Sequence, residues 1–138
     1  HTILYREENV ADRVRALTKG DGVPVVYDSV GKDTWEGSLD SLSPRGMMVS
    51  FGNASGPVPP VNLGILSQKG SLYVTRPTLY HYTSTKESLR ETADALFDVV
   101  AKGKVKIEIH QTYALADAAQ AHVDLEGRKT TGSTVILP

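Results

Sequence analysis

Cysteine is absent from the 138-residue sequence, and the two signs of charge nearly cancel. The absence of cysteine excludes disulfides, thiolate catalysis, cysteine-ligated zinc and iron–sulfur clusters within this chain. Fifteen Lys and Arg residues against sixteen Asp and Glu residues give a formal net charge of −1. This balance leaves no electrostatic footprint for nucleic acid or an anionic membrane. We therefore expect no nucleic-acid partner, and the lack of cysteine fits a cytoplasmic location.

The sequence also lacks the patterns of a membrane span and of a metal site. No basic-then-apolar leader is visible at its start. The longest stretch without a charged residue or histidine, residues 46–68, contains Pro57, Pro59 and Pro60, which do not suit a bilayer-spanning helix. The four histidines are far apart and form no H-x-x-H or H-E-x-x-H pattern. We expect no membrane partner and no metal ligand.

The first half of the sequence alternates strand and helix patterns. Residues 23–30 (VPVVYDSV) and 46–51 (GMMVSF) are nearly continuous apolar runs, typical of strands buried on both faces of a parallel sheet. The expected elements are a short strand at 2–5, a helix with Asn9 as N-cap, a strand at 23–30, a helix that Thr34 caps and that carries Trp35, Leu39 and Leu42, a strand at 46–51, a helix at 62–68 and a strand at 71–74. Strands joined by helices through short connections predict right-handed crossovers and the fold class α/β.

The pattern changes after Arg76 and Pro77, where half-exposed elements are expected. The expected elements are a helix with a capping box at Ser84 and Glu87 and an apolar face of Leu89, Ala93, Leu96, Phe97 and Val100, an alternating strand at 105–109, a helix that Asp117 caps and that carries Ala118, Ala121, His122 and Leu125, and a strand at 134–137. His122 lies on the core side of its helix and is expected to be a hydrogen-bonded packing residue. We place a domain boundary near Leu79, with residues 1–79 in one domain and residues 80–138 in another.

A glycine-rich segment is the strongest candidate site, although the sequence has no G-x-G-x-x-G dinucleotide motif. Residues 52–56 (GNASG) follow an expected parallel strand and lead into prolines. Phe51 offers a flat apolar surface and Asn53 a donor and an acceptor at the carboxyl end of that strand, where ligands of open α/β sheets bind. An ordinary strand-end turn is the alternative. Asp28, at the end of the preceding strand, is expected to accept backbone N–H bonds.

Five segments together resemble one enzyme family over essentially the whole chain. They are residues 4–8 (LYREE), 25–31 (VVYDSVG), 48–56 (MVSFGNASG), 62–77 (NLGILSQKGSLYVTRP) and 114–138 (ALADAAQAH…LEGRKTTGSTVILP). The chain resembles the NADPH-dependent quinone oxidoreductases, the zeta-crystallin-like, zinc-free branch of the medium-chain dehydrogenase/reductases. The resemblance implies a partial Rossmann-like parallel sheet followed by the C-terminal α+β segment of the catalytic lobe. It also implies that the chain begins after the family's glycine-rich turn.

The resemblance assigns cofactor-binding positions residue by residue. It places Tyr5 near the adenosine 2′-phosphate, Ser29 beside the adenine ribose, Phe51, Gly52 and Asn53 beside the ribose and nicotinamide half, the backbone of Val74, Thr75 and Arg76 near the carboxamide, and Arg128 near the phosphates. Without the resemblance, each of these residues also has a structural interpretation with no role in cofactor binding. Tyr5 and Ser29 suit a strand end and a loop, Arg76 suits an ion pair at a domain boundary, and Arg128 suits a solvated surface.

The implied activity is hydride transfer from NADPH to a quinone or related conjugated carbonyl. No side chain here is expected to be an obligatory proton donor, and we expect the isolated chain to be inactive. The strand at 71–74 implies a homodimer through the edge of the nucleotide-binding sheet. Two alternatives stay open: a non-catalytic nucleotide-responsive binding or structural protein, for example one that binds AU-rich RNA, and an enoyl reductase of the same superfamily.

Overall fold

The computed structural model describes all residues from His1 to Pro138, and the chain divides into two compact units. The first unit is His1–Tyr82 and the second is Thr83–Pro138. The division falls a few residues after the boundary that we expected near Leu79.

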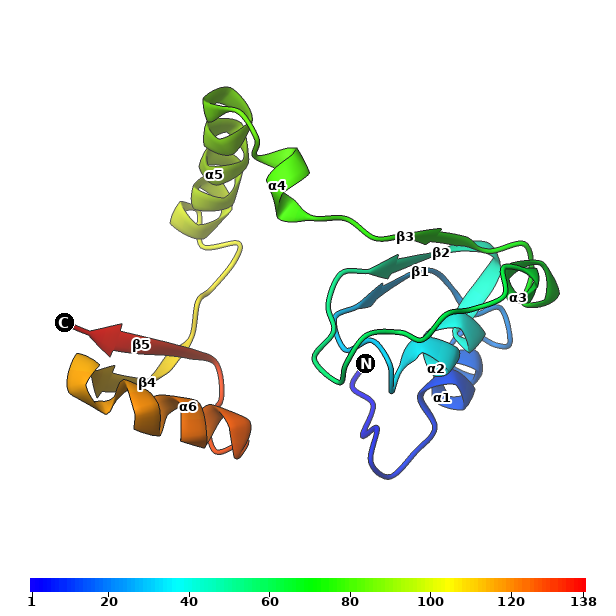
Figure 1. Ribbon diagram of the computed structural model, residues 1–138, viewed down its shortest axis with the longest axis horizontal. Helices are drawn as coiled ribbons and strands as arrows, with labels where there is room; N and C mark the ends of the chain where they lie inside the picture. The colour runs from blue at the N-terminus through cyan, green and yellow to red at the C-terminus, as the bar shows by residue number, and fades with distance from the viewer. The chain divides into compact units, whose positions relative to one another are not determined.

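Three parallel strands form the sheet of the first unit (Figure 1). They are β1 (Val23–Asp28), β2 (Leu42–Ser50) and β3 (Tyr73–Thr75), in the order β1-β2-β3. The register aligns Tyr27 with Val49 and Val49 with Thr75. All three strands therefore end at one edge of the sheet. This arrangement confirms the expected α/β class with a parallel sheet.

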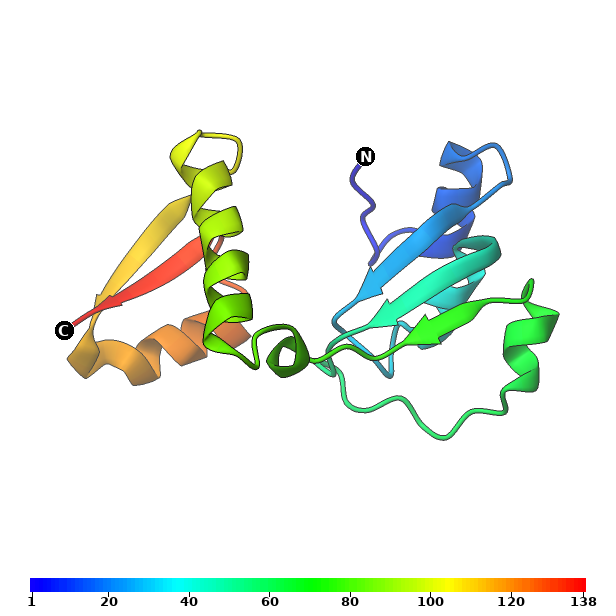
Figure 2. The same cartoon turned by 90° about the horizontal axis from the view of Figure 1, so that it is seen from above.

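Helices cover one face of this sheet (Figures 1 and 2). They are α1 (Val10–Leu17), α2 (Trp35–Asp40) and the short α3 (Gly64–Gln68). Asn9 caps α1 as expected, since its side chain accepts a hydrogen bond from the backbone N–H of Asp12 at 3.0 Å. The buried core between helices and sheet consists of Trp35, Leu39, Leu42, Met48 and Leu72, with Ile65 and Leu66 of α3 packed against it.

The opposite face of the sheet is open, which contradicts our expectation of strands buried on both faces. Tyr27 is 75% exposed, and Met47 and Tyr73 on the same face are also exposed. Right-handed crossovers place α2 and α3 on one side, so neither of these helices covers the other side. Val74, which lies beside the buried Met48, is itself exposed. The apolar runs in the sequence therefore predicted the positions of the strands correctly. The prediction that both faces of these strands are buried was wrong.

Two local predictions for the first unit were wrong, and a third, for Thr34, was right about position only. Residues 2–5 form no strand, because the backbone there turns through hydrogen bonds to the carbonyl of Leu4 and no strand lies beside it. Thr34 is the N-cap residue of α2 as expected, but without a side-chain cap bond, since its hydroxyl donates to Asp28 and Gly31 instead. Leu42 belongs to β2, not to the helix, which ends at Asp40.

The first unit ends with the short helix α4 (Leu79–Tyr82), and the second unit begins beyond it. The second unit contains a parallel pair of strands. Its elements are α5 (Lys86–Ala101), β4 (Ile109–Ala114), the 3₁₀ turn η1 (Leu115–Asp117), α6 (Ala118–Glu126) and β5 (Ser133–Leu137). No helix in the chain combines the length and apolar character needed to cross a bilayer.

Two predictions for the second unit shift along the chain, and a third, for His122, is wrong. The capping box of α5 joins Thr85 and Ser88 and does not involve Ser84 and Glu87. The predicted strand at 105–109 begins only at Ile109, where it finds its partner in β5. Asp117 is the N-cap residue of α6 as expected, but without a side-chain bond. His122 is exposed and is not a core residue.

Candidate functional site

The loops that follow β1 and β2 are bonded to each other at the carboxyl edge of the first sheet. The backbone N–H of Ala54 donates to the Ser29 carbonyl at 3.2 Å, and that of Ser55 donates to the Val30 carbonyl at 2.8 Å. In return, the backbone N–H of Lys32 donates to the Gly56 carbonyl at 3.1 Å. The glycine-rich segment 52–56 is therefore held against the 29–34 loop by a ladder of hydrogen bonds, which an isolated strand-end turn would lack.

The Asp28 side chain, at the end of β1, holds the 29–34 loop through hydrogen bonds. One carboxylate oxygen accepts from the backbone N–H groups of Val30 and Gly31, at 2.8 and 2.9 Å. The other accepts from the hydroxyls of Thr34 and Ser38, both at 2.7 Å. Burial opposes ionisation, but the four hydrogen bonds prevail and lower the pKa of Asp28 below its ordinary value. The expected role of this residue as an acceptor for backbone N–H groups is confirmed.

Gly52 lies where no side chain fits. A Cβ built on it would lie 2.2 Å from the Ser29 carbonyl oxygen and 2.8 Å from two other backbone atoms of Ser29. Gly31 combines a positive φ of 93° with a Cβ position 2.6 Å from the Gly56 carbonyl oxygen. Both glycines are therefore required for the two loops to approach so closely.

Arg76 joins the third strand to the same edge. Its Nη1 donates to the carbonyl of Ser50 at 2.9 Å and to the carbonyl of Gly52 at 3.0 Å. It also lies 3.2 Å from the Ser50 hydroxyl. Arg76 therefore uses its side chain to bind backbone carbonyls of the first unit, and no acidic side chain of that unit forms an ion pair with it.

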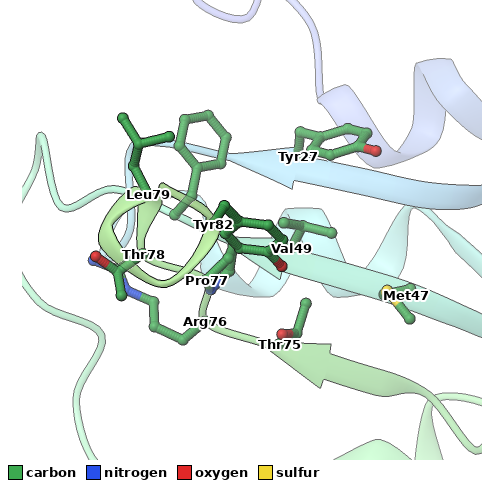
Figure 3. A pocket seen from close by; sticks show the side chains of 10 residues that line it. Tyr27, Met47, Val49, Thr75, Arg76, Pro77, Thr78, Leu79 and Tyr82 are labelled. Carbon is green, nitrogen blue, oxygen red and sulfur yellow. The ribbon is translucent and has the colours of Figure 1, made fainter. Parts of the chain in front are cut away.

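A groove of about 880 Å³ lies over the open face of the sheet and reaches this edge (Figure 3). Figure 3 shows Tyr82 of α4 beside Val49. The lining residues come from all three strands and from the segment after β3, and they are Tyr27, Met47, Val49, Phe51, Thr75, Arg76, Pro77, Thr78, Leu79 and Tyr82. The groove is mostly apolar, so it offers flat contact area and few groups that would hold a charge.

Tyr5 lies at a different cavity of the first unit. That cavity, of about 360 Å³, is bordered by Tyr5, Glu8, Asn9, Asp33 and Thr34 among others. Two carboxylates and no cation line it. The phosphate role implied for Tyr5 therefore needs a cation from outside this lining, because the carboxylates repel an anion.

The structure brings together six of the nine predicted cofactor residues. These six are Ser29, Phe51, Gly52, Asn53, Thr75 and Arg76. Val74 lies on the helix-covered face beside Met48, and Arg128 belongs to the second unit, in the turn after α6. Sequence reasoning missed Ser55, whose hydroxyl donates to the Val30 carbonyl and accepts from the Asp33 backbone N–H. Its position within the glycine-rich segment was the signal available.

No group of three or more His, Cys, Asp or Glu side chains in the chain is arranged to hold a metal ion. The candidate site is therefore an edge of backbone amides and carbonyls with an apolar groove beside it. An arrangement of this kind orients a bound nucleotide and supplies no acid–base pair of its own.

Comparisons with known proteins identify the family to which the chain belongs. Residues 1–136 match the sequence model of the family described as zinc-binding dehydrogenase. A quinone oxidoreductase of Pseudomonas aeruginosa is 66% identical over 137 residues, which cover 99% of this chain and 42% of that protein. A 2-haloacrylate reductase of Burkholderia sp. is 46% identical over 100% of this chain and 42% of that protein.

Among solved structures, Escherichia coli quinone oxidoreductase complexed with NADPH matches with a TM-score of 0.92 and 55% identity. The match covers 99% of this chain and 42% of that one. The chain thus spans less than half the length of these relatives. The resemblance to quinone oxidoreductases is confirmed, and the chain belongs to the zinc-binding dehydrogenase family.

Proposed function

We propose that this chain is the C-terminal part of an NADPH-dependent quinone oxidoreductase and forms part of its cofactor site. The observation that carries the proposal is the interlocked edge of Ser29, Gly52 and Arg76. It lies where ligands bind to open α/β sheets. The NADPH complex of the Escherichia coli relative supports the choice of cofactor.

When bound, NADPH supplies the hydride that reduces the acceptor. The residues of this chain hold and orient it. Gly52 lets the 51–53 loop lie against the Ser29 backbone, and Phe51, which is 50% exposed, offers an apolar surface at this edge. Asn53 is an exposed donor and acceptor at the same edge. No side chain of the site donates a proton in this account, which suits a quinone acceptor.

The units fit two domains of such an enzyme. We assign residues 1–79 to the nucleotide-binding domain and residues 80–138 to the catalytic domain. Strands β1 to β3 lie wholly within the first range, and the pair β4 and β5 lies wholly within the second. The isolated chain is expected to be catalytically inactive, and the full-length protein to be active in the cytoplasm.

The family's name implies zinc, and the residues of this chain do not fit that metal. The chain has no cysteine, and its four histidines form no cluster with carboxylates. The resemblance to quinone oxidoreductases implies a zinc-free branch, and we assign the full-length protein to it on that ground. Metal analysis of the purified protein after exhaustive dialysis should give less than one zinc per ten chains. Stoichiometric zinc would contradict the assignment.

The full-length protein should prefer NADPH to NADH. Tyr5 and Arg128 are the two residues of this chain that we assign to phosphate contacts. One hydrogen bond to a charged phosphate contributes roughly 1.5–3 kcal/mol, which corresponds to a factor of about ten or more in affinity. We expect Tyr5→Phe to lower kcat/KM for NADPH by about tenfold and to leave NADH nearly unchanged.

Steady-state kinetics with both cofactors tests this prediction, and Tyr80→Phe is the matched control. Tyr80 is a similarly exposed tyrosine that we assign no cofactor contact. Equal kcat/KM values for NADPH and NADH in the unmodified protein would refute the preference. An equal loss with both cofactors in Tyr5→Phe would refute the role of Tyr5.

We also propose a homodimer through the edge of β3. This strand is bonded to β2 on one side only, and Tyr73 and Val74 on it are exposed. An unpaired apolar edge favours pairing with another chain. Light scattering of the full-length protein at micromolar concentration should report a dimer. A monomer whose mass does not change on dilution would contradict the proposal.

Reduction of an activated carbon–carbon double bond is the second candidate activity. The 2-haloacrylate reductase relative favours it. Assays with a quinone, a 2-haloacrylate and an enoyl thioester as alternative acceptors separate these reactions. The third candidate, a non-catalytic RNA-binding role, predicts a shift of AU-rich RNA in gels and no NADPH oxidation with any acceptor. The near-zero net charge argues against it.

A further inference from the structure

The pairing of β2 and β3 by backbone hydrogen bonds stops before the strands reach the cofactor edge. Its last aligned pair is Val49 and Thr75. One residue after Thr75, the Arg76 side chain supplies the hydrogen bonds between the two strand ends. Its Nη1 donates to the carbonyls of Ser50 and Gly52, at 2.9 and 3.0 Å. A side chain thus continues the contact between the two strand ends where the backbone of β3 no longer does.

The loop of residues 51–53 is consequently held from two sides. On the β1 side, the Phe51 backbone N–H donates to the Asp28 carbonyl at 2.8 Å, and Gly52 lies against the Ser29 backbone. On the β3 side, the bonds to Ser50 and Gly52 come from Arg76. Removing Arg76 would leave the carbonyls of Ser50 and Gly52 without this donor and the loop attached on one side only.

We propose that Arg76 is a positioning residue that orders the 51–53 loop and thereby orients the nicotinamide half of the cofactor. The inference rests on the proposed function, because it takes this loop to lie beside the nicotinamide. The Arg76 side chain acts through the loop and makes no contact with the cofactor in this account. Its positive charge strengthens both hydrogen bonds to the carbonyls.

The test compares Arg76→Met with Arg76→Lys in the full-length protein. Methionine keeps an unbranched apolar stem and removes the donors, whereas lysine restores a cationic donor of a different shape. Arg90→Met is the matched control, because Arg90 is exposed on α5 and forms only a surface ion pair with Asp94. Amide hydrogen exchange without cofactor measures the order of the loop directly. We expect exchange at residues 51–54 to accelerate by about tenfold or more in Arg76→Met, and by less in Arg76→Lys.

Cofactor binding provides the second readout. In Arg76→Met, the KM for NADPH should rise by about tenfold, equivalent to about 1.4 kcal/mol. The Kd of 2′-phospho-ADP-ribose, which lacks nicotinamide, should stay within about twofold of the unmodified protein. If Arg76 contributed only to overall stability, its replacement would weaken the binding of both nucleotides equally.

Unchanged hydrogen exchange in Arg76→Met would overturn the proposal, and so would an equal loss of affinity for both nucleotides. Rescue by Arg76→Lys toward the unmodified exchange rates and KM would support it. If the unmodified protein bound no NADPH, the proposed function would fall. The exchange measurement, which needs no cofactor, would still decide whether Arg76 orders the loop.

Discussion

Replacing Gly52 by alanine is expected to disrupt the cofactor edge more than any other one-methyl change in the first unit. The added Cβ would lie 2.2 Å from the Ser29 carbonyl oxygen, far inside normal contact distance. The atoms that the Cβ would meet are backbone atoms just after β1, so the clash cannot be relieved by the movement of a flexible side chain. Overpacking of this kind costs about 1–3 kcal/mol or more, and the shift it forces moves Phe51 and Asn53 with the loop.

We expect Gly52→Ala to lower NADPH affinity by at least about tenfold and to lower the melting temperature of the full-length protein by several degrees. Calorimetric titration and thermal unfolding measure the two effects. Gly37→Ala is the matched control, because a Cβ on Gly37 meets no atom within 4 Å and alanine favours the helix α2. NADPH binding within twofold of the unmodified protein would show that the loop tolerates a side chain.

Replacing Asp28 by alanine should have the largest effect on stability. Asp28 is 4% exposed, and its carboxylate accepts four hydrogen bonds. Alanine leaves two backbone N–H groups and two hydroxyls without their acceptor. Bonds to a charged group contribute roughly 1.5–3 kcal/mol each, and they are not additive, so we expect a loss of about 3–5 kcal/mol. Urea unfolding at pH 7 measures it.

The contribution of Asp28 should also depend on pH in a defined direction. The hydrogen bonds lower its folded-state pKa below the unfolded-state value, which is about 3.9 for aspartate. A lowered folded-state pKa contributes stability above the unfolded-state pKa, and that stability is lost as pH falls through the folded-state pKa. The difference in unfolding free energy between the unmodified protein and Asp28→Asn should therefore be constant near neutral pH and shrink below about pH 4.

Asp21→Asn, a change at an exposed turn residue, is the control for this series. A difference between the unmodified protein and Asp28→Asn that stayed constant down to pH 2 would contradict the role assigned to the carboxylate. So would a loss below about 1 kcal/mol in Asp28→Ala, since that is the value of a single ordinary hydrogen bond.

The parallel direction of the strands and the edge at which they end could be predicted from the sequence. Apolar runs at Val26 and Met48 fix which segments form strands, and short connections fix that the strands are parallel. The role of Asp28 followed from its place at a strand end. The helix cap at Asn9 followed from residue type and spacing.

The open face of the sheet could not be predicted. An apolar run does not reveal whether both faces are covered, and Tyr27 and Met47 lie exposed in the same runs as the buried Met48 and the half-buried Val26 of the helix-covered face. Arg76 could be predicted as part of the edge, but its hydrogen bonds to Ser50 and Gly52 depend on the distance between two strand ends. The shift of the capping box to Thr85 reflects three adjacent residues, 83–85, that each carry a hydroxyl suitable for the role.

The central claim is that these 138 residues form part of the cofactor site of an NADPH-dependent quinone oxidoreductase. The most direct test joins them to the preceding part of the Pseudomonas aeruginosa quinone oxidoreductase, whose aligned region is 66% identical. Steady-state NADPH oxidation with a quinone is then measured for this chimera and for the chain alone. We expect the chimera to reduce the quinone with a kcat/KM within about tenfold of the relative, and the chain alone to show no turnover. A folded chimera that neither binds NADPH nor reduces the quinone would contradict the claim.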